Sequence, residues 1–312
     1  MQRTITRLTA LILSAAALAS LLLLTGCGRA GLNEAGKGSG TDTKDGLNIV
    51  TSFFPVYVAV INVAHDIPGV SVTNMTEPQT GCLHDYTLRP QDLKLLEDAD
   101  IFIINGAGME AFLEDIAAQQ KDLKIIEAAE GIPLLREESG EENPHVWVSL
   151  SNAVLYVRSI AAQLSQVDKK NAALYEQNAA AYIKKIEELS KEMHTEIGSL
   201  KNKDIITFHE AFPYFANEFD LNIAAVVERE PGTEPTQKEL GEIIETVKQT
   251  GIKALFAEPQ YSSRAAETIA GETGAVLYTL DPVVTGEAVP DAADAYLDAM
   301  RQNMETLKKA LQ

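Results

Sequence analysis

The chain has 312 residues, of which 45 are Asp or Glu and 26 are Lys or Arg, so its formal net charge is −19. Nucleic acid and anionic lipid carry the same sign of charge and would repel such a protein, so we expect neither as a partner. Two cysteines cannot supply a disulfide framework, and stability must come from the burial of an ordinary core.

The first 26 residues have the pattern of a secretory signal peptide. Arg3 and Arg7 precede an apolar run over residues 8–24, and two small residues separate this run from Cys27. An apolar run that meets a small-small-cysteine sequence resembles the lipobox of bacterial lipoproteins, which implies cleavage before Cys27 and acylation of its thiol. A retained membrane-spanning anchor is the alternative, because the run is about long enough to cross a bilayer. We therefore expect an extracytoplasmic protein that is lipid-anchored to the bacterial cell membrane.

Residues 27–46 are predicted to be a lipidated cysteine followed by a flexible tether. Gly, Ser, Thr and Lys dominate the stretch GRAGLNEAGKGSGTDTKDG, which contains little that could form a core. About 18 residues of this kind span roughly 25 Å on average, enough to lift a domain off a bilayer. The folded part is expected to begin near Leu47.

From there, short apolar runs typical of strands alternate with patterns of helical spacing. Strands are predicted at residues 47–52, 70–75, 101–105, 123–127, 204–208, 222–227, 253–257 and 275–280. Helices are predicted at residues 55–66, 90–97, 109–120, 238–250, 262–273 and 291–311. Residues 151–198 contain no proline and one late glycine, and the spacing at 168–197 predicts a helix of nearly thirty residues.

Strands separated by helices predict right-handed βαβ units and parallel sheets. The predicted fold class is therefore α/β, with two Rossmann-like βα lobes joined by a single long connecting helix. The N-terminal lobe is placed at 47–150, the helical connector at 151–200 and the C-terminal lobe at 201–312.

Four side chains of metal-binding type follow strands or lead out of the first lobe. His84 lies in the loop after strand 70–75, His145 in the loop that leaves the first lobe, and His209 and Asp281 directly after later strands. Ligands of open α/β sheets bind beyond the carboxyl ends of the strands, so these four can converge in one cleft between the lobes. Neutral imidazoles with a carboxylate suit a borderline divalent metal, and four such groups fit tetrahedral zinc.

The stretches around these residues are CLHDYTLRPQDLKLLEDADIFIINGAGME, NPHVWVSLSNA, FHEAFPYFANEFDL and FAEPQYSSRAAETIAGETGAVLYTLDP. They resemble the motifs of the zinc/manganese substrate-binding proteins of ABC transporters, the cluster A-I solute-binding family. The resemblance covers Leu47 to the C-terminus and implies metal ligands at His84, His145, His209 and Asp281. It further implies an ion buried between two lobes that a rigid helix bridges. The partners that it implies are a membrane permease and the cytoplasmic ATPase that drives it.

Three features depart from the family or stay open. Many zinc-type members carry a long histidine-rich loop before the second histidine ligand, whereas this chain has the short acidic stretch REESGEENPH, which either gathers cations loosely or is simply solvated. Cys82 lies two residues before His84, on the same side of an extended segment, and is either an accessory ligand or a small buried hydrophobe. Glu258 follows a strand and is expected to support the ligands rather than bind the metal.

Three imidazoles and one carboxylate favour zinc, whereas replacing an imidazole by a carboxylate would favour manganese. We therefore predict a monomeric, non-enzymatic component that captures zinc for uptake, with manganese or another divalent metal as the alternative. A secreted zinc hydrolase is a rival from another class, with Glu258 as its base, but the sequence has no His-Glu-x-x-His and four protein ligands would close the site. A binding protein for metal chelates is a second rival, and an additional adhesion role is compatible with the sequence.

Overall fold

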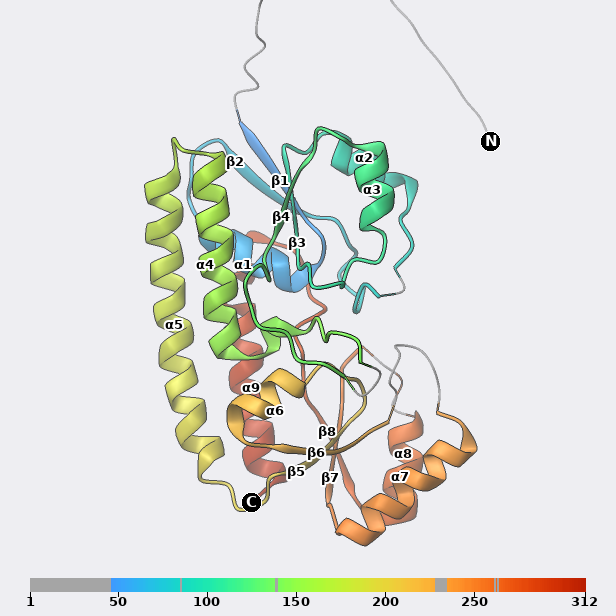
Figure 1. Ribbon diagram of the computed structural model, residues 1–312. Helices are drawn as coiled ribbons and strands as arrows, with labels where there is room; N and C mark the ends of the chain where they lie inside the picture. The colour runs from blue at the N-terminus through green and yellow to red at the C-terminus, as the bar shows by residue number, and fades with distance from the viewer. Residues whose placement is uncertain (1–45, 85, 138–139, 228–234, 261, 263) are drawn as a thin grey trace, which may run out of the picture. The chain divides into compact units, whose positions relative to one another are not determined.

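The computed structural model describes residues 46–84, 86–137, 140–227, 235–260, 262 and 264–312. The predicted signal peptide, Cys27 and all of the tether except Gly46 lie outside these residues. In the described residues, the strands form two parallel sheets of four strands each, with the orders β2-β1-β3-β4 and β6-β5-β7-β8 (Figure 1). The α/β fold with two lobes is confirmed, and the lobe bounds at 47–150, 151–200 and 201–312 stay predictions.

The first sheet matches the predicted strands to within one residue at each end. Its strands and helices are β1 (Leu47–Thr51), α1 (Phe54–Val63), β2 (Val70–Asn74), α2 (Pro90–Glu97), β3 (Ile101–Ile104), α3 (Leu113–Gln119) and β4 (Lys124–Glu127). All four residues of β3 are buried, as expected for an inner strand of a parallel sheet that is covered on both faces. The strand β1 pairs with β2 and β3, so the loops after these strands leave the same edge of the sheet.

The second sheet repeats this arrangement. Its strands and helices are β5 (Asp204–Thr207), α6 (Pro213–Phe219), β6 (Asn222–Val226), α7 (Gln237–Thr250), β7 (Ala254–Ala257), α8 (Arg264–Thr273) and β8 (Val276–Thr279). Helix α7 begins with a capping box between Thr236 and Glu239 and ends at Gly251, whose φ of +72° a glycine adopts without strain. The sequence did not predict α6, whose seven residues are too few to show a helical period.

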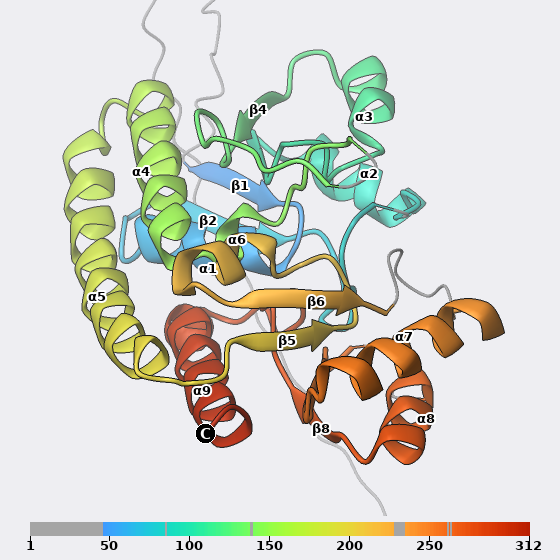
Figure 2. The ribbon, with the colours of Figure 1, turned by 60° about the horizontal axis from the view of Figure 1, so that its bottom comes forward.

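Two helices make up the connector. Helix α4 (Leu150–Val167) and helix α5 (Ala172–Gly198) lie side by side, and α5 continues past α4 toward the second sheet (Figures 1 and 2). The long helix predicted at 168–197 is confirmed, and the structure adds α4 as its antiparallel partner. Helix α9 (Ala295–Ala310) packs against α5, and a short 3₁₀ helix, η2 (Pro290–Asp294), forms the start of the predicted closing helix.

The carboxylate of Glu218 on α6 ties the second lobe to the connector. It accepts hydrogen bonds from the backbone N–H of Ser151 and from the hydroxyls of Ser149 and Ser151. These groups form the first turn of α4, where the helix dipole favours an anion. Glu218 therefore holds α6 against the N-terminus of α4.

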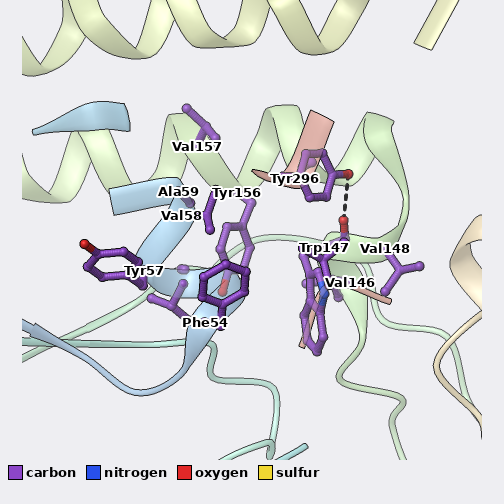
Figure 3. Packing of buried hydrophobic residues seen from close by; sticks show 14 of the residues in the cluster. Phe54, Tyr57, Val58, Ala59, Val146, Trp147, Val148, Tyr156, Val157 and Tyr296 are labelled. Carbon is purple, nitrogen blue, oxygen red and sulfur yellow. Dashed lines mark hydrogen bonds between the residues drawn. The ribbon is translucent and has the colours of Figure 1, made fainter. Parts of the chain in front are cut away.

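Aromatic side chains fill the space between α1, α4 and α9 (Figure 3). Trp147, in the 3₁₀ helix η1 (Val146–Val148), is 2% exposed and packs edge-on against Phe53. Its indole Nε1 donates to the carbonyl of Pro282 at 2.8 Å, and Tyr296 Oη donates to the carbonyl of Trp147 at 2.9 Å. These bonds join the segment after His145 to Pro282, which follows β8, and to α9.

Candidate metal centre

His145 lies in the loop between β4 and α4, directly before η1, and is 1% exposed. Its backbone N–H donates to Asn143 Oδ1 at 3.0 Å, and its ring Nδ1 lies 3.1 Å from the same oxygen. An amide oxygen only accepts, so Nδ1 carries the proton and Nε2 keeps its lone pair. Burial first, and then repulsion from His209 and His84, hold the pKa of His145 well below its ordinary value of 6.5. The ring is therefore neutral and ready to bind a metal.

His84 lies in the loop that connects β2 to α2. The far end of this loop is held by Asp92, whose carboxylate accepts from Tyr86 Oη at 2.8 Å and from Arg89 N at 2.8 Å. Asp92 is the third residue of α2, so the bond to Arg89 N also caps that helix. The start of α2 therefore anchors the loop that carries His84.

His209 follows β5 by two residues and is 3% exposed. Its Nε2 lies 3.1 Å from His145 Nε2, and His84 Nε2 lies 3.5 Å from the same atom. Tetrahedral zinc with Zn–N distances of about 2.05 Å places two ligand nitrogens about 3.3 Å apart. His145 Nε2 therefore lies from each of the other two nitrogens at about the spacing that one tetrahedral ion requires.

A fourth donor lies in the same group. The ligand atoms of Cys82, His84, His145 and His209 all lie within 4.8 Å of one another. Cys82 and His84 come from the loop after β2, His145 from the loop after β4, and His209 from the loop after β5. All four thus lie in loops that follow the carboxyl ends of parallel strands, where open α/β sheets bind ligands.

Asn143 connects the site to the side chain of Glu137 and the backbone of Glu210. Its Nδ2 donates to Glu137 Oε1 at 3.0 Å and to the backbone carbonyl of Glu210 at 2.7 Å, while its Oδ1 faces His145. These two acceptors fix the orientation of the amide. Partners of this kind hold a ligating histidine in one tautomer and one direction.

Glu110 holds the loop after β3 in place. It is buried, and its carboxyl accepts from Ser52 Oγ at 2.8 Å, Asn105 N at 2.8 Å and Gly106 N at 3.0 Å. Burial raises the pKa of Glu110 to about 7, although these donors favour its charged form. Asn105 Nδ2 in turn donates to the carbonyl of Pro144, the residue before His145. The buried carboxyl thus supports the segment that presents His145.

A cleft of about 640 Å³ adjoins the histidines and is rich in acidic side chains. Its lining includes His84, His145, His209, Glu127, Glu137, Glu141, Glu142 and Glu210. Burial first, and then a hydrogen bond and repulsion from Glu210, raise the pKa of Glu137 to about 7. The negative charge around the cleft favours cations over anions.

The other two side chains proposed from the sequence lie apart from this group of four. Asp281 Oδ1 accepts from Val283 N at 2.7 Å, and the backbone of Asp281 bonds in both directions with the amide of Asn303 on α9. Burial raises the pKa of Asp281, which the Val283 N–H partly offsets. Glu258 is 2% exposed at the end of β7, where Gln260 Nε2 donates to its Oε2.

Sequence reasoning passed over Asn143, Glu110 and Glu210. The sequence did carry a signal for Asn143, which stands two residues before a histidine in Asn-Pro-His. At this spacing an asparagine side chain commonly accepts a hydrogen bond from the backbone N–H two residues later. Glu110 and Glu210 had none, because only the folded chain brings them to Asn105 and Glu137.

The arrangement agrees with comparisons to known proteins. A family model described as "ZnuA: Zinc-uptake complex component A periplasmic" matches residues 49–310. The chain belongs to the ZnuA family. ZnuA is a family of zinc-uptake components rather than of enzymes, so this chain is an extracytoplasmic metal-binding component of an uptake system.

Relatives of the ZnuA family are similar over most of this chain. The high-affinity zinc uptake system protein ZnuA of Bacillus subtilis is 32% identical and matches over 94% of this chain and 95% of its own length. The zinc-binding lipoprotein AdcA of Streptococcus pneumoniae is 31% identical over 84% of this chain, which spans 55% of AdcA. A solved structure of the substrate-binding protein FpvC of Pseudomonas aeruginosa with Mn²⁺ has 30% identity and a TM-score of 0.76, covering 85% of this chain and 98% of that one.

These names confirm the predicted family and its zinc and manganese chemistry. AdcA of Streptococcus pneumoniae is named a lipoprotein, and the family model is described as periplasmic. Among the described residues, none of the helices combines the length and the apolar character that crossing a bilayer requires.

Proposed function

We propose that this chain is the substrate-binding component of an ABC transporter, which captures zinc outside the cytoplasm and delivers it to a membrane permease driven by an ATPase. Manganese is the alternative cargo. The protein acts as a non-enzymatic monomer, and Cys27 carries the lipid that holds it to the membrane. The tether at 27–46 then lets the metal-binding part reach a permease in the same membrane.

One observation carries this proposal. The Nε2 atoms of His209 and His84 lie 3.1 and 3.5 Å from His145 Nε2, so imidazoles from both lobes meet at one point. The rings of His145 and His209 are buried. Neutral imidazole is a ligand of zinc and its neighbours in the first transition series. Asp281, the fourth ligand proposed from the sequence, accepts from Val283 N through Oδ1, which leaves Oδ2 as the oxygen that would bind the ion.

Titration of the purified chain with zinc and manganese tests the proposal. We expect tight zinc binding and weaker manganese binding. Removal of an outer partner of a ligand usually lowers metal affinity by about 10- to 100-fold, and His209→Ala should lower zinc affinity by more than that. His65→Ala is the matched control, because His65 lies near the end of α1 with an exposed side chain, contacts Asp66 Oδ2 at 3.4 Å and does not belong to the group of four. A wild-type chain that binds neither ion tightly, or a His209→Ala variant equal to it, would contradict the proposal.

Release to the permease is proposed to need only local rearrangement. Helix α5 is continuous over 27 residues and packs against α1, α6 and α9. A helix that contacts both lobes resists a wide hinge motion. Small-angle scattering of the chain with and without zinc should give nearly the same radius of gyration, and a large change on metal addition would count against this mechanism.

A further inference from the structure

Cys82 brings a fourth donor atom to the three histidines. Its Sγ lies 3.3 Å from His145 Nε2 and within 4.8 Å of a ring nitrogen of each histidine. In tetrahedral zinc sites, with Zn–S of about 2.3 Å and Zn–N of about 2.05 Å, sulfur and nitrogen are about 3.6 Å apart. The thiol therefore lies where a fourth ligand of the same ion would lie.

Cys82 and His84 lie on either side of a buried residue. Leu83 is fully buried, and its N–H contacts Met109 Sδ at 3.4 Å. Cys82 and His84, on either side of Leu83, are only half-buried, and their donor atoms belong to the group of four. The two donors thus flank a buried residue at a bend in the loop after β2.

Asp281 has a different set of contacts. Its carboxylate accepts from Val283 N at 2.7 Å, and Asn303 on α9 bonds both its backbone N–H and its carbonyl. Asp281 Oδ1 closes a local turn of the chain after β8, and the next residue, Pro282, accepts from Trp147 Nε1. In these contacts, Asp281 stabilises the chain segment that follows β8.

We propose that Cys82 is a metal ligand, so that one thiolate and three imidazoles bind the ion while Asp281 supports the end of β8. The inference rests on the proposed function and deepens it by naming the fourth ligand. Thiolate is a soft ligand that zinc accepts and manganese, which prefers oxygen, does not. Cys82 therefore biases the site toward zinc and against manganese.

Cobalt(II) tests the ligand directly, because a thiolate bound to tetrahedral cobalt gives a near-ultraviolet charge-transfer band that imidazole and carboxylate do not give. We expect this band when cobalt chloride is added to the full chain, and we expect zinc to abolish it. Cys82→Ser should lose the band while keeping the visible bands of cobalt held by the histidines. Because Cys27 is still present in Cys82→Ser, loss of the band assigns it to Cys82.

Competition between zinc and manganese gives a second readout. Cys82→Ser should lose at least about tenfold in zinc affinity, and its preference for zinc over manganese should fall. Asp281→Asn is the matched variant, since an amide oxygen can still accept from Val283 N, and it should keep both the band and the zinc affinity. Circular dichroism of both variants establishes that they fold.

The outcomes separate this inference from the function. Cobalt bound by the wild-type chain without the charge-transfer band would overturn Cys82 as a ligand and leave the three-histidine site standing. A loss of zinc affinity in Asp281→Asn, with none in Cys82→Ser, would overturn it in favour of the carboxylate. A wild-type chain that bound neither cobalt nor zinc would overturn the proposed function itself.

Discussion

His145 Nε2 lies 3.1 Å from His209 Nε2, although 64 positions separate the two histidines in the chain. His145 belongs to the loop after β4 of the first sheet, and His209 follows β5 of the second. An ion that binds both rings therefore joins the two lobes, so metal binding and stability should be linked.

Zinc should stabilise the folded chain, and a chelator should reverse the effect. Free zinc at about a thousand times its dissociation constant adds roughly 4 kcal/mol to the free energy of unfolding, because only the folded chain assembles the site. Thermal unfolding with zinc, and then with excess chelator, measures this. The stabilisation should be largely absent in His209→Ala, and an equal rise in the melting temperature of both proteins would contradict the link.

Asn143→Ala should weaken zinc binding by about 10- to 100-fold, the usual effect of removing the outer partner of a ligating histidine. The substitution removes the oxygen that faces His145 Nδ1 and frees Glu137 and the carbonyl of Glu210. Competition with a chromophoric chelator measures the affinity. Glu137→Gln is the control, because its amide oxygen can still accept from Asn143 Nδ2 and should preserve most of the affinity.

Glu110 should make the metal-free chain less stable as pH rises. Its carboxyl has a pKa of about 7 in the folded state and an ordinary value of 4.5 when unfolded, so between these values the folded state holds a proton that the unfolded state has lost. The stabilisation is complete below pH 4.5, falls as pH rises through 7 and then levels off. The expected loss is about 3 kcal/mol, at 1.36 kcal/mol for each pKa unit.

Urea unfolding at several pH values tests this dependence, with Glu110→Gln as the comparison. Glutamine does not titrate, so the difference in unfolding free energy between wild type and variant should shift by about 3 kcal/mol across this range. Parallel curves for the two proteins would show that Glu110 does not titrate there.

Gly106→Ala should destabilise the chain more than Gly108→Ala. Both glycines have positive φ, +77° and +83°, so alanine is strained at either position by about 1 kcal/mol or more. Only at Gly106 would a new Cβ meet another side chain, since it would lie 2.7 Å from Glu127 Oε2 and 3.1 Å from Glu127 Cβ. Paired chemical unfolding measures the difference, and equal losses would mean that Glu127 simply moves aside.

Local chemistry in the sequence was enough to predict most elements and to single out three of the four grouped residues. Strand runs such as 101–105 are bounded by polar residues, and the spacing at 168–197 allows little other than a helix. Helix α6 was not predicted, because seven residues carry too little periodicity. Helix α4 was not distinguished from α5, because Asp168–Asn171 is a polar turn within a helix-forming stretch. Both failures concern patterns that are short on the scale of a helical turn.

The order of elements along the sequence determined that this protein has two α/β lobes and that histidines follow several of its strands. Tertiary structure decided which donor atoms meet. Asp281 was a predicted ligand and Cys82 a possible accessory one, yet Cys82 Sγ lies 3.3 Å from His145 Nε2, and hydrogen bonds to Val283 and Asn303 hold Asp281 beside the end of β8. The reason is physical: periodicity specifies which face a residue takes within its own element, whereas donor distances depend on how separate loops pack against one another.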